Sequence, residues 1–162
     1  MRANELGKNR PVDFQWHQVE AAVYTIVGRM QLSNYAPSRI IAIARGGLVP
    51  GVMLSHTLKL PLEVITAESY TPDNKQTPET YICLESLTCH TGSYGPETLV
   101  IDDIYDTGRT MEEVRKILPN CNYAVLVHKG YNNMPGKEHY IGMRSGEGWI
   151  TFPWERVIMP RP

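Results

Sequence analysis

Three aspartates, Asp102, Asp103 and Asp106, are the residues best suited to chemistry, because they closely follow an apolar run at 99–101. A short unbroken run of Leu, Val and Ile is typical of a buried parallel strand. Carboxylates are unfavourable inside such a strand, so we expect Asp102 and Asp103 to lie where it meets solvent. Ligands of open α/β sheets bind at this carboxyl end. Paired acids there can hold a cation or the two hydroxyls of a diol.

Small and hydroxylated residues follow the acids and open a predicted helix. Thr107, Gly108 and Thr110 offer hydroxyl and backbone N–H groups at the helix N-terminus, where the peptide dipoles favour an anion such as phosphate. The structural alternative is an ordinary turn in which Asp106 caps the helix. A cap explains one acid and not three, so we favour a phosphate site next to a cation or diol site.

A second loop has the same arrangement between a strand and a helix. Arg45, Gly46 and Gly47 follow the apolar run 40–43 and precede a predicted helix that starts near Pro50. Two successive glycines permit a close backbone approach, and their N–H groups can form an anion-binding nest beside the charge of Arg45. The alternative is a tight turn with a surface arginine. Next to the first motif, the loop favours a pyrophosphate contact.

The composition places limits on the class of protein. The chain has 162 residues, which suits one domain spanning 1–162, and no linker divides it. Its formal net charge is −1 with 20% charged residues, so no bulk nucleic-acid or anionic membrane partner is indicated. The N-terminus lacks an apolar signal-type stretch, and no apolar run approaches the length of a membrane span. We therefore expect a soluble cytoplasmic protein without an integral membrane segment.

The cysteines do not suggest a metal site or a disulfide framework. Cys83, Cys89 and Cys121 are odd in number and share no metal-type spacing, so we expect reduced thiols. Cys89 is followed by His90, but two adjacent ligands without companions do not make a metal centre.

The periodicity of apolar residues predicts an alternation of helices and strands. Helices are expected at 15–31, 50–59 and 109–118, and strands at 40–43, 62–66, 81–87, 99–102 and 123–127. Asp13 is expected to cap the first helix, whose apolar stripe comprises Val19, Ala22, Val23, Ile26, Val27 and Met30. Residues 70–80 are polar and rich in Pro, which favours a long mobile loop used as a lid. The pattern predicts an α/β fold, a mainly parallel twisted sheet flanked by helices on both faces.

The segment 99–110 resembles the phosphoribosyl pyrophosphate signature of type I phosphoribosyltransferases, an apolar run followed by Asp-Asp-x-x-Asp-Thr-Gly-x-Thr. The Arg45 loop resembles the pyrophosphate loop of the same family. Lys129 after an apolar strand, and the tail from Trp149 to Glu155, are similar to bacterial xanthine-guanine phosphoribosyltransferases. This resemblance extends over about 13–157. Without the other motifs, Lys129 is better interpreted as a surface lysine, and the alternative for the tryptophans is a core or interface role.

The resemblance implies a type I phosphoribosyltransferase fold with a mobile lid loop and a small C-terminal hood. It implies purine salvage: a 6-oxopurine base (guanine, xanthine or hypoxanthine) and phosphoribosyl pyrophosphate give a nucleoside 5′-monophosphate and pyrophosphate, with Mg²⁺ as cofactor. Asp106 would be the general base. The residues implied in binding phosphoribosyl pyrophosphate are Arg45, Gly46, Gly47, Lys75, Asp102, Asp103, Asp106, Thr107, Gly108, Arg109 and Thr110. Those implied in purine binding are Asp106, Lys129, Trp149 and Ile150, and the metal ligands are Asp103 and Glu155.

The chain departs from the family pattern at three places. Glu155 replaces an aspartate near the metal, Lys75 and Gln76 stand where the family has Gln-Arg, and the segment 131–147 is longer. The resemblance also implies a homodimer or homotetramer. Two alternatives remain open: a nucleotide-sensing regulator of the same fold that binds RNA or protein, and a phosphoribosyltransferase for another base. A regulator that binds RNA should have a basic face, which this balanced chain does not indicate.

Overall fold

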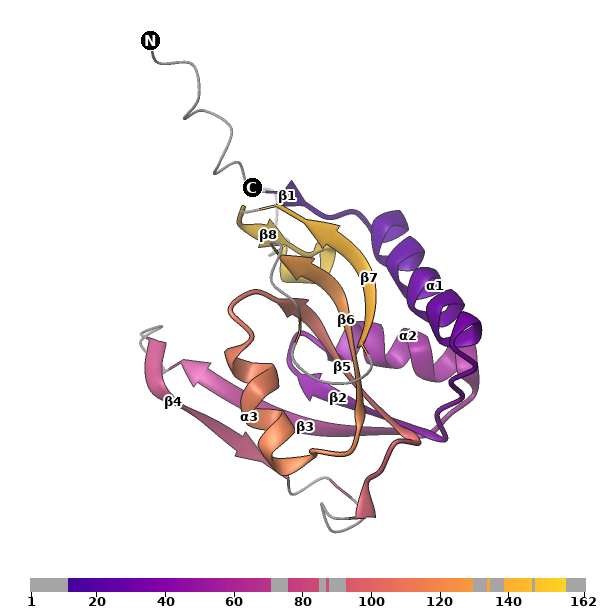
Figure 1. Ribbon diagram of the computed structural model, residues 1–162. Helices are drawn as coiled ribbons and strands as arrows, with labels where there is room; N and C mark the ends of the chain where they lie inside the picture. Colours follow the sequence, from indigo (N-terminus) through magenta and orange to yellow (C-terminus); the bar gives the residue numbers. More distant parts are fainter. Residues whose placement is uncertain are drawn as a thin grey trace, which may run out of the picture.

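A six-stranded sheet forms the centre of the computed structural model, which describes residues 12–70, 76–84, 87, 93–129, 134, 139–146 and 148–156 (Figure 1). The strand order is β4-β3-β2-β5-β6-β7, and all neighbours are parallel except β3 and β4. The strands are β2 (Arg39–Ala44), β3 (Leu62–Tyr70), β4 (Gln76–Cys83), β5 (Thr98–Tyr105), β6 (Asn122–Lys129) and β7 (His139–Ser145). The predicted α/β class with a mainly parallel sheet is confirmed.

Helices cover both faces of this sheet, so its central strands are buried on both sides (Figure 1). Helices α1 (Trp16–Leu32) and α2 (Leu48–Leu58) pack on one face, and α3 (Arg109–Ile117) packs on the other. The predicted stripe of α1 is buried at every position but Val27, which is partly buried. Burial on both faces explains why β2, β5 and β6 are almost continuously apolar.

The chain reverses its direction across the sheet between β2 and β5. From β2 it passes to β3 and β4 on one side, and then returns to β5, β6 and β7 on the other. Such a reversal leaves the loops after the two central strands diverging to opposite faces, which opens a crevice at their carboxyl ends. The topology therefore places any ligand beyond the ends of β2 and β5.

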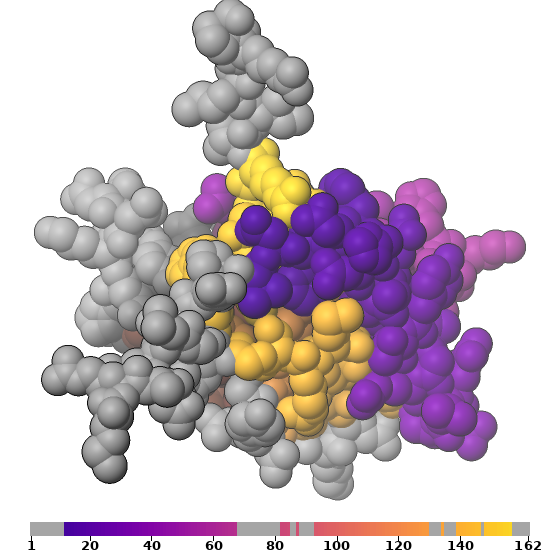
Figure 2. Space-filling view, turned by 90° about the horizontal axis from the view of Figure 1, so that it is seen from above, coloured from indigo at the N-terminus to yellow at the C-terminus, as the bar shows by residue number. Residues whose placement is uncertain are grey.

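A second, two-stranded sheet joins the two ends of the described chain. Strand β1 (Val12–Asp13) pairs in parallel with β8 (Ile150–Thr151), which leads into the 3₁₀ turn η2 (Pro153–Glu155). Figure 2 shows the indigo N-terminal part of the described chain lying against the yellow C-terminal segment. The N-terminal strand thus contacts the segment in which base-binding residues are predicted.

The helix boundaries differ slightly from the predictions. Helix α1 is preceded by Gln15 as its N-cap, and not by Asp13, which belongs to β1. The Gln15 N–H donates to Oε1 of Gln18 at 2.9 Å. This capping box satisfies a backbone donor at the start of the helix, a task that Asp13 was expected to perform.

The expectation that the central strand ends at Asp102 is wrong. Strand β5 continues to Tyr105, and both Asp102 and Asp103 lie within it with only 8% of their surface exposed. The register pairs Asp102 with Val125 and Ile104 with Val127, so the ladder to β6 holds the acidic stretch in extended form. The acids therefore lie at the floor of a cavity and not at an open strand end.

The predicted lid loop at 70–80 is too long. Strand β3 reaches Tyr70 and β4 begins at Gln76, five residues before the expected strand at 81–87. Pro78 is tolerated in β4 because this is the edge strand and the β3–β4 register shifts between the pairs Glu68–Tyr81 and Tyr70–Gln76, on either side of residue 78. The remaining predicted lid residues, 71–75, lie outside the described part of the chain.

Strand β7 was not predicted at all. Its sequence includes His139, Gly142 and Arg144, which interrupt the apolar run expected of a buried strand. Gly142 is required by packing, since a Cβ there would lie 2.7 Å from the Leu126 carbonyl oxygen and 2.8 Å from that of Ala22. The strand is specified by its close approach to β6 and α1, which local periodicity does not reveal.

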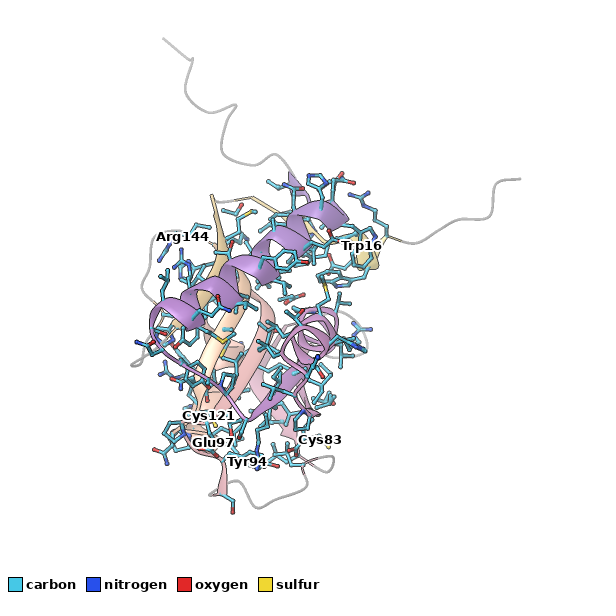
Figure 3. All side chains as sticks on the ribbon, turned by 90° about the vertical axis from the view of Figure 1, so that its right-hand side faces the viewer. Trp16, Cys83, Tyr94, Glu97, Cys121 and Arg144 are labelled. Carbon is cyan, nitrogen blue, oxygen red and sulfur yellow. The ribbon has the colours of Figure 1, made fainter. Side chains whose placement is uncertain are left out.

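The two cysteines in the described residues are free thiols, Cys83 exposed and Cys121 buried. Burial raises the pKa of the Cys121 thiol to about 12, so this group is unreactive. Figure 3 shows it near Tyr94 and Glu97, at the opposite end of the molecule from Trp16. Cys89 and His90 lie outside the described residues. Among the helices that are described, none combines the length and apolar character needed to span a bilayer.

Candidate active site

A cavity of about 380 Å³ lies at the carboxyl ends of β2 and β5, where the topology predicts it. Its walls come from the loops after both strands, from the end of β6 and from the C-terminal segment. Of the predicted site residues it contains Arg45, Gly46, Asp102, Asp103, Asp106, Thr107, Gly108, Arg109, Thr110, Lys129, Trp149, Ile150 and Glu155. Gly47 lies behind this wall, and Lys75 falls outside the described residues.

The two glycine-containing loops meet directly in this cavity. A Cβ atom at Gly46 would overlap the carboxylate of Asp103, so only glycine lets the two strand ends approach so closely. At Gly47 a Cβ would lie 2.5 Å from the Ile101 carbonyl oxygen and 2.7 Å from that of Ile43. The peptide bond between Ala44 and Arg45 is cis. Residues 45–47 and 102–110 therefore form one site, as the sequence predicted.

The buried acids give the cavity floor a strong preference for cations or hydroxyl donors. Burial, and then the negative charge of Glu155, raise the pKa of Asp103 to about 6. Burial, and then the charge of Asp103, raise the pKa of Asp102 well above its ordinary value. Oδ1 of Asp102 also accepts from the Asp103 N–H at 2.9 Å. A bound cation would offset the burial and the mutual repulsion that raise the pKa values of these carboxyls.

The donor set fits Mg²⁺ bound together with a phosphorylated ligand. Among the described residues, no three Asp, Glu, His or Cys side chains form a preformed metal cage. Mg²⁺ usually takes only one or two carboxylates and completes its shell with water and substrate phosphates. Asp103 and Glu155 both line the cavity, and Glu155 acts electrostatically on Asp103. This pair supplies the number of protein ligands that Mg²⁺ requires.

The turn after β5 presents backbone N–H groups to the cavity. Gly108 is the N-cap of α3 with a φ of 84°, and no side chain caps this helix. A Cβ at Gly108 would overlap the phenol of Tyr105, which supports the turn from below. The ring of Tyr105 in turn stacks on His128 at 5.0 Å. The N–H groups at a helix start favour an anion, and the residues predicted to hold a phosphate, Thr107 to Thr110, line the cavity.

Lys129 and Asp106 form an ion pair at the edge of the cavity. Nζ of Lys129 lies 2.9 Å from Oδ2 of Asp106, which joins the end of β6 to the turn after β5. The Lys129 side chain is 16% exposed and that of Asp106 is 57% exposed. Lys129 is therefore a cavity residue and not a surface lysine. The pair places a hydrogen-bond donor beside an acceptor.

The two tryptophans of the C-terminal segment have different surroundings. Trp149 is 73% exposed and lines the cavity. Trp154 is packed, stacking on Phe152 with ring centres 4.6 Å apart and lying 6.0 Å from Trp16. Figure 3 shows Trp16 at the start of α1, beside this segment. Trp149 therefore lies where a purine-binding residue is expected, whereas Trp154 fits the alternative of a core residue.

Seven of the residues that line the cavity were not predicted from the sequence: Ile43, Ala44, Ala67, Ile104, Tyr105, Met111 and Phe152. The two aromatic ones are Tyr105 and Phe152. Both line the cavity, and each is at most 5% exposed. Tyr105 occupies a variable position of the acidic signature, so its type carried no signal. Its position beneath Gly108 becomes visible only when the turn is folded.

Comparisons with known proteins agree with this geometry. The model of the family described as "Phosphoribosyl transferase domain" matches residues 14–156. The chain is 28% identical over 147 residues to a xanthine-guanine phosphoribosyltransferase of Cereibacter sphaeroides, covering 88% of this chain and 86% of the relative. It is 29% identical over 148 residues to that of Idiomarina loihiensis, covering 91% and 88%.

Solved structures also resemble the chain. The purine phosphoribosyltransferase of Pyrococcus horikoshii has a TM-score of 0.70 at 28% identity, covering 94% of this chain and 99% of its own. A hypothetical protein of Neisseria gonorrhoeae with bound ppGpp has a TM-score of 0.76 at 22% identity, covering 93% and 92%. At that identity the second likeness concerns the fold alone.

Proposed function

Because the chain belongs to the phosphoribosyl transferase domain family, we propose that it is a purine salvage enzyme. It transfers the phosphoribosyl group of phosphoribosyl pyrophosphate to a 6-oxopurine, guanine, xanthine or hypoxanthine, and releases pyrophosphate. The observation that carries the proposal is the single cavity bounded by both amide-rich loops, by buried acids and by Lys129. The xanthine-guanine phosphoribosyltransferases that the chain resembles support the choice of base.

The phosphoribosyl donor occupies the floor of the cavity between the two loops. Residues 107–110 hold its 5′-phosphate through backbone N–H and hydroxyl groups at the start of α3. Asp102 and Asp103 accept the ribose hydroxyls. Arg45, Gly46 and Lys75 bind the pyrophosphate, whose negative charge grows as it leaves. Gly47, whose N–H donates to the Ile43 carbonyl oxygen at 2.8 Å, shapes this loop from behind the cavity wall.

Asp103 and Glu155 would hold Mg²⁺, which when bound would supply positive charge against the phosphates of the donor. With the cation present, Asp103 is ionised in spite of its burial. Glu155 keeps its own orientation because Oε2 accepts from the Phe152 N–H at 2.8 Å. This hydrogen bond restrains the Glu155 side chain, which is longer than the aspartate typical of the family.

The Asp106–Lys129 pair is complementary to one edge of a 6-oxopurine. In its N7–H form that base presents an N–H donor at N7 beside an oxygen acceptor at C6. The ion pair presents an acceptor, Oδ2 of Asp106, beside a donor, Nζ of Lys129. A 6-aminopurine would instead direct its amino donor at the ammonium group. The geometry therefore favours oxygen over nitrogen at C6.

The reaction replaces one bond to the anomeric carbon with another. The bond from this carbon to the pyrophosphate oxygen breaks, and a bond to the purine ring nitrogen forms. The imidazole proton of the base passes to Asp106, the general base, so the purine becomes a better nucleophile as it attacks. Trp149 stacks on the purine face, and the Ile150 backbone contacts the substituent at C2.

An assay of the wild-type enzyme with Mg²⁺ and phosphoribosyl pyrophosphate tests the proposal. We expect pyrophosphate release with guanine, xanthine or hypoxanthine, and at least tenfold less with adenine or uracil. Release with adenine or uracil alone would indicate another acceptor. If no base causes pyrophosphate release, the result would favour the regulatory alternative. The formal net charge of −1 does not support RNA binding by such a regulator.

The proposal includes the organisation of the protein. The chain acts as one catalytic domain over 1–162 and assembles as a homodimer or homotetramer, with a cytoplasmic location. Large exposed apolar side chains on α1, such as Tyr24 at 68% and Leu32 at 87% exposure, are compatible with a subunit contact.

A further inference from the structure

The N-terminal strand β1 holds the segment that is proposed to contact the purine. The Val12 N–H donates to the carbonyl oxygen of Trp149 at 2.7 Å, and the Phe14 N–H donates to that of Thr151 at 2.9 Å. The register pairs Val12 with Ile150. Two carbonyl groups of the C-terminal segment are therefore directed at β1.

The geometry of a β-strand determines the direction of the Ile150 backbone groups, which lie between the Trp149 and Thr151 carbonyls. Successive backbone carbonyls of a strand alternate between its two edges, so Ile150 directs its N–H and C=O to the edge that β1 does not occupy. Trp149 and Ile150 line the cavity, whereas Val12 and Asp13 do not. Ile150 is 6% exposed as a whole residue and its side chain belongs to the core, so we assign its contact with the cavity to the backbone.

Contacts of Phe14 with residues that follow β8 also hold this register. Nη2 of Arg156 donates to the Phe14 carbonyl oxygen at 3.1 Å. The Phe14 ring lies 5.5 Å from that of Phe152, which stacks on Trp154. A slip of β1 by one residue would break these contacts and would turn Phe14 away from Phe152.

We propose that β1 is a specificity-positioning strand: by binding the Trp149 and Thr151 carbonyls it selects the Ile150 backbone to contact the C2 substituent of the purine. The inference rests on the proposed function and goes beyond it, because it assigns discrimination at C2 to residues 12–14, which do not touch the base. Val12 and Phe14 are positioning residues, and Arg156 secures them.

Replacing a backbone donor tests this directly. Val12→Pro removes the N–H that binds the Trp149 carbonyl. We expect kcat/KM for guanine and for xanthine to fall about tenfold relative to hypoxanthine, which carries only hydrogen at C2, as for the loss of one well-placed hydrogen bond. The KM for phosphoribosyl pyrophosphate should change less than about twofold, since its loops are distant in the chain.

Asp13→Pro is the matched control. It introduces the same ring one residue on, but the alternation of β1 turns the Asp13 N–H away from β8, so base selectivity should not change. Arg156→Gln should shift selectivity in the same direction as Val12→Pro, by a smaller factor, and it supplies the decisive measurement if Val12→Pro does not fold.

The outcomes are distinguishable. A selective loss in Val12→Pro or Arg156→Gln but not in Asp13→Pro supports the inference. Equal losses for all three bases, unchanged selectivity, or the same shift in Asp13→Pro would overturn it and leave the proposed function intact. A wild-type enzyme inactive with every 6-oxopurine would overturn both.

Discussion

At the scale of single residues, the three aspartates of the site differ in their burial and in their charged neighbours. Asp102 and Asp103 are buried side by side, whereas Asp106 is exposed and paired with Lys129. These surroundings separate the three acids of one short segment into two groups. The buried pair suits a cation and a sugar, and the exposed acid, which can exchange its partner, suits proton transfer.

Replacing Asp106 tests its proposed part as general base. Asp106→Asn should lower kcat by about 10²–10⁴-fold, because the side chain keeps its size but loses the proton acceptor. The affinity for phosphoribosyl pyrophosphate, measured by calorimetry, should change little. Glu112→Gln, an exposed acid of α3 outside the cavity, serves as the control. Equal losses in turnover and donor affinity would contradict the assignment.

At the scale of elements, the loops after β2 and β5 act as one unit because glycine allows them to touch. Gly46 lies against the Asp103 carboxylate, and Gly47 lies against backbone oxygens of Ile101 and Ile43. A side chain at the first position displaces a flexible group of the site. At the second position it meets backbone of the central strands, which cannot move without disturbing the sheet.

Alanine substitutions should separate these two effects. Gly46→Ala should raise the KM for phosphoribosyl pyrophosphate by about tenfold or more with little loss of stability, whereas Gly47→Ala should destabilise the fold, measured by denaturant unfolding. Gly28→Ala in α1 is the control, since nothing lies within 4 Å of its Cβ position. It should raise stability by about 0.5–1 kcal/mol and leave activity unchanged. Loss of stability in Gly46→Ala with an unchanged KM for phosphoribosyl pyrophosphate would argue against a part of this contact in binding the donor.

At the scale of the whole molecule, the site reduces the stability of the fold that carries it. Asp103 has a pKa of about 6 when folded, against an ordinary value of 3.8. Well below pH 3.8 the group is protonated in both states. As the pH rises from about 3.8 to about 6, the unfolded chain releases this proton before the folded one does, so the free energy of unfolding falls, and it levels off at higher pH. A bound cation reverses this cost, which couples folding to ligand binding.

Asp103→Asn should therefore stabilise the ligand-free protein near pH 7.5, by an amount on the order of 2 kcal/mol. The difference should shrink towards zero at about pH 3 and below, where the wild-type carboxyl is protonated in both the folded and the unfolded protein. Denaturant unfolding of both proteins at a series of pH values measures it. A difference that is the same at both ends of the series would show that Asp103 is not the titrating group. The variant should also bind phosphoribosyl pyrophosphate weakly.

The sequence by itself determined the chemistry and the class of the fold. The acids, glycines and hydroxyls of 102–110 and 45–47 are contiguous, and each follows a strand whose buried character is visible in its own residues. Parallel strands bring their carboxyl ends to one edge, so the meeting of the two loops could be predicted without knowing the strand order.

Only the tertiary structure decided which distant segments complete the site. Strand β7, the edge strand β4, the pairing of β1 with β8 and the Asp106–Lys129 ion pair all depend on contacts between residues far apart in the chain. The same holds for Tyr105 beneath Gly108, where a side chain and a turn fit each other. Local periodicity reports how an element buries its own face, whereas register and partner are set by the packing of the whole molecule.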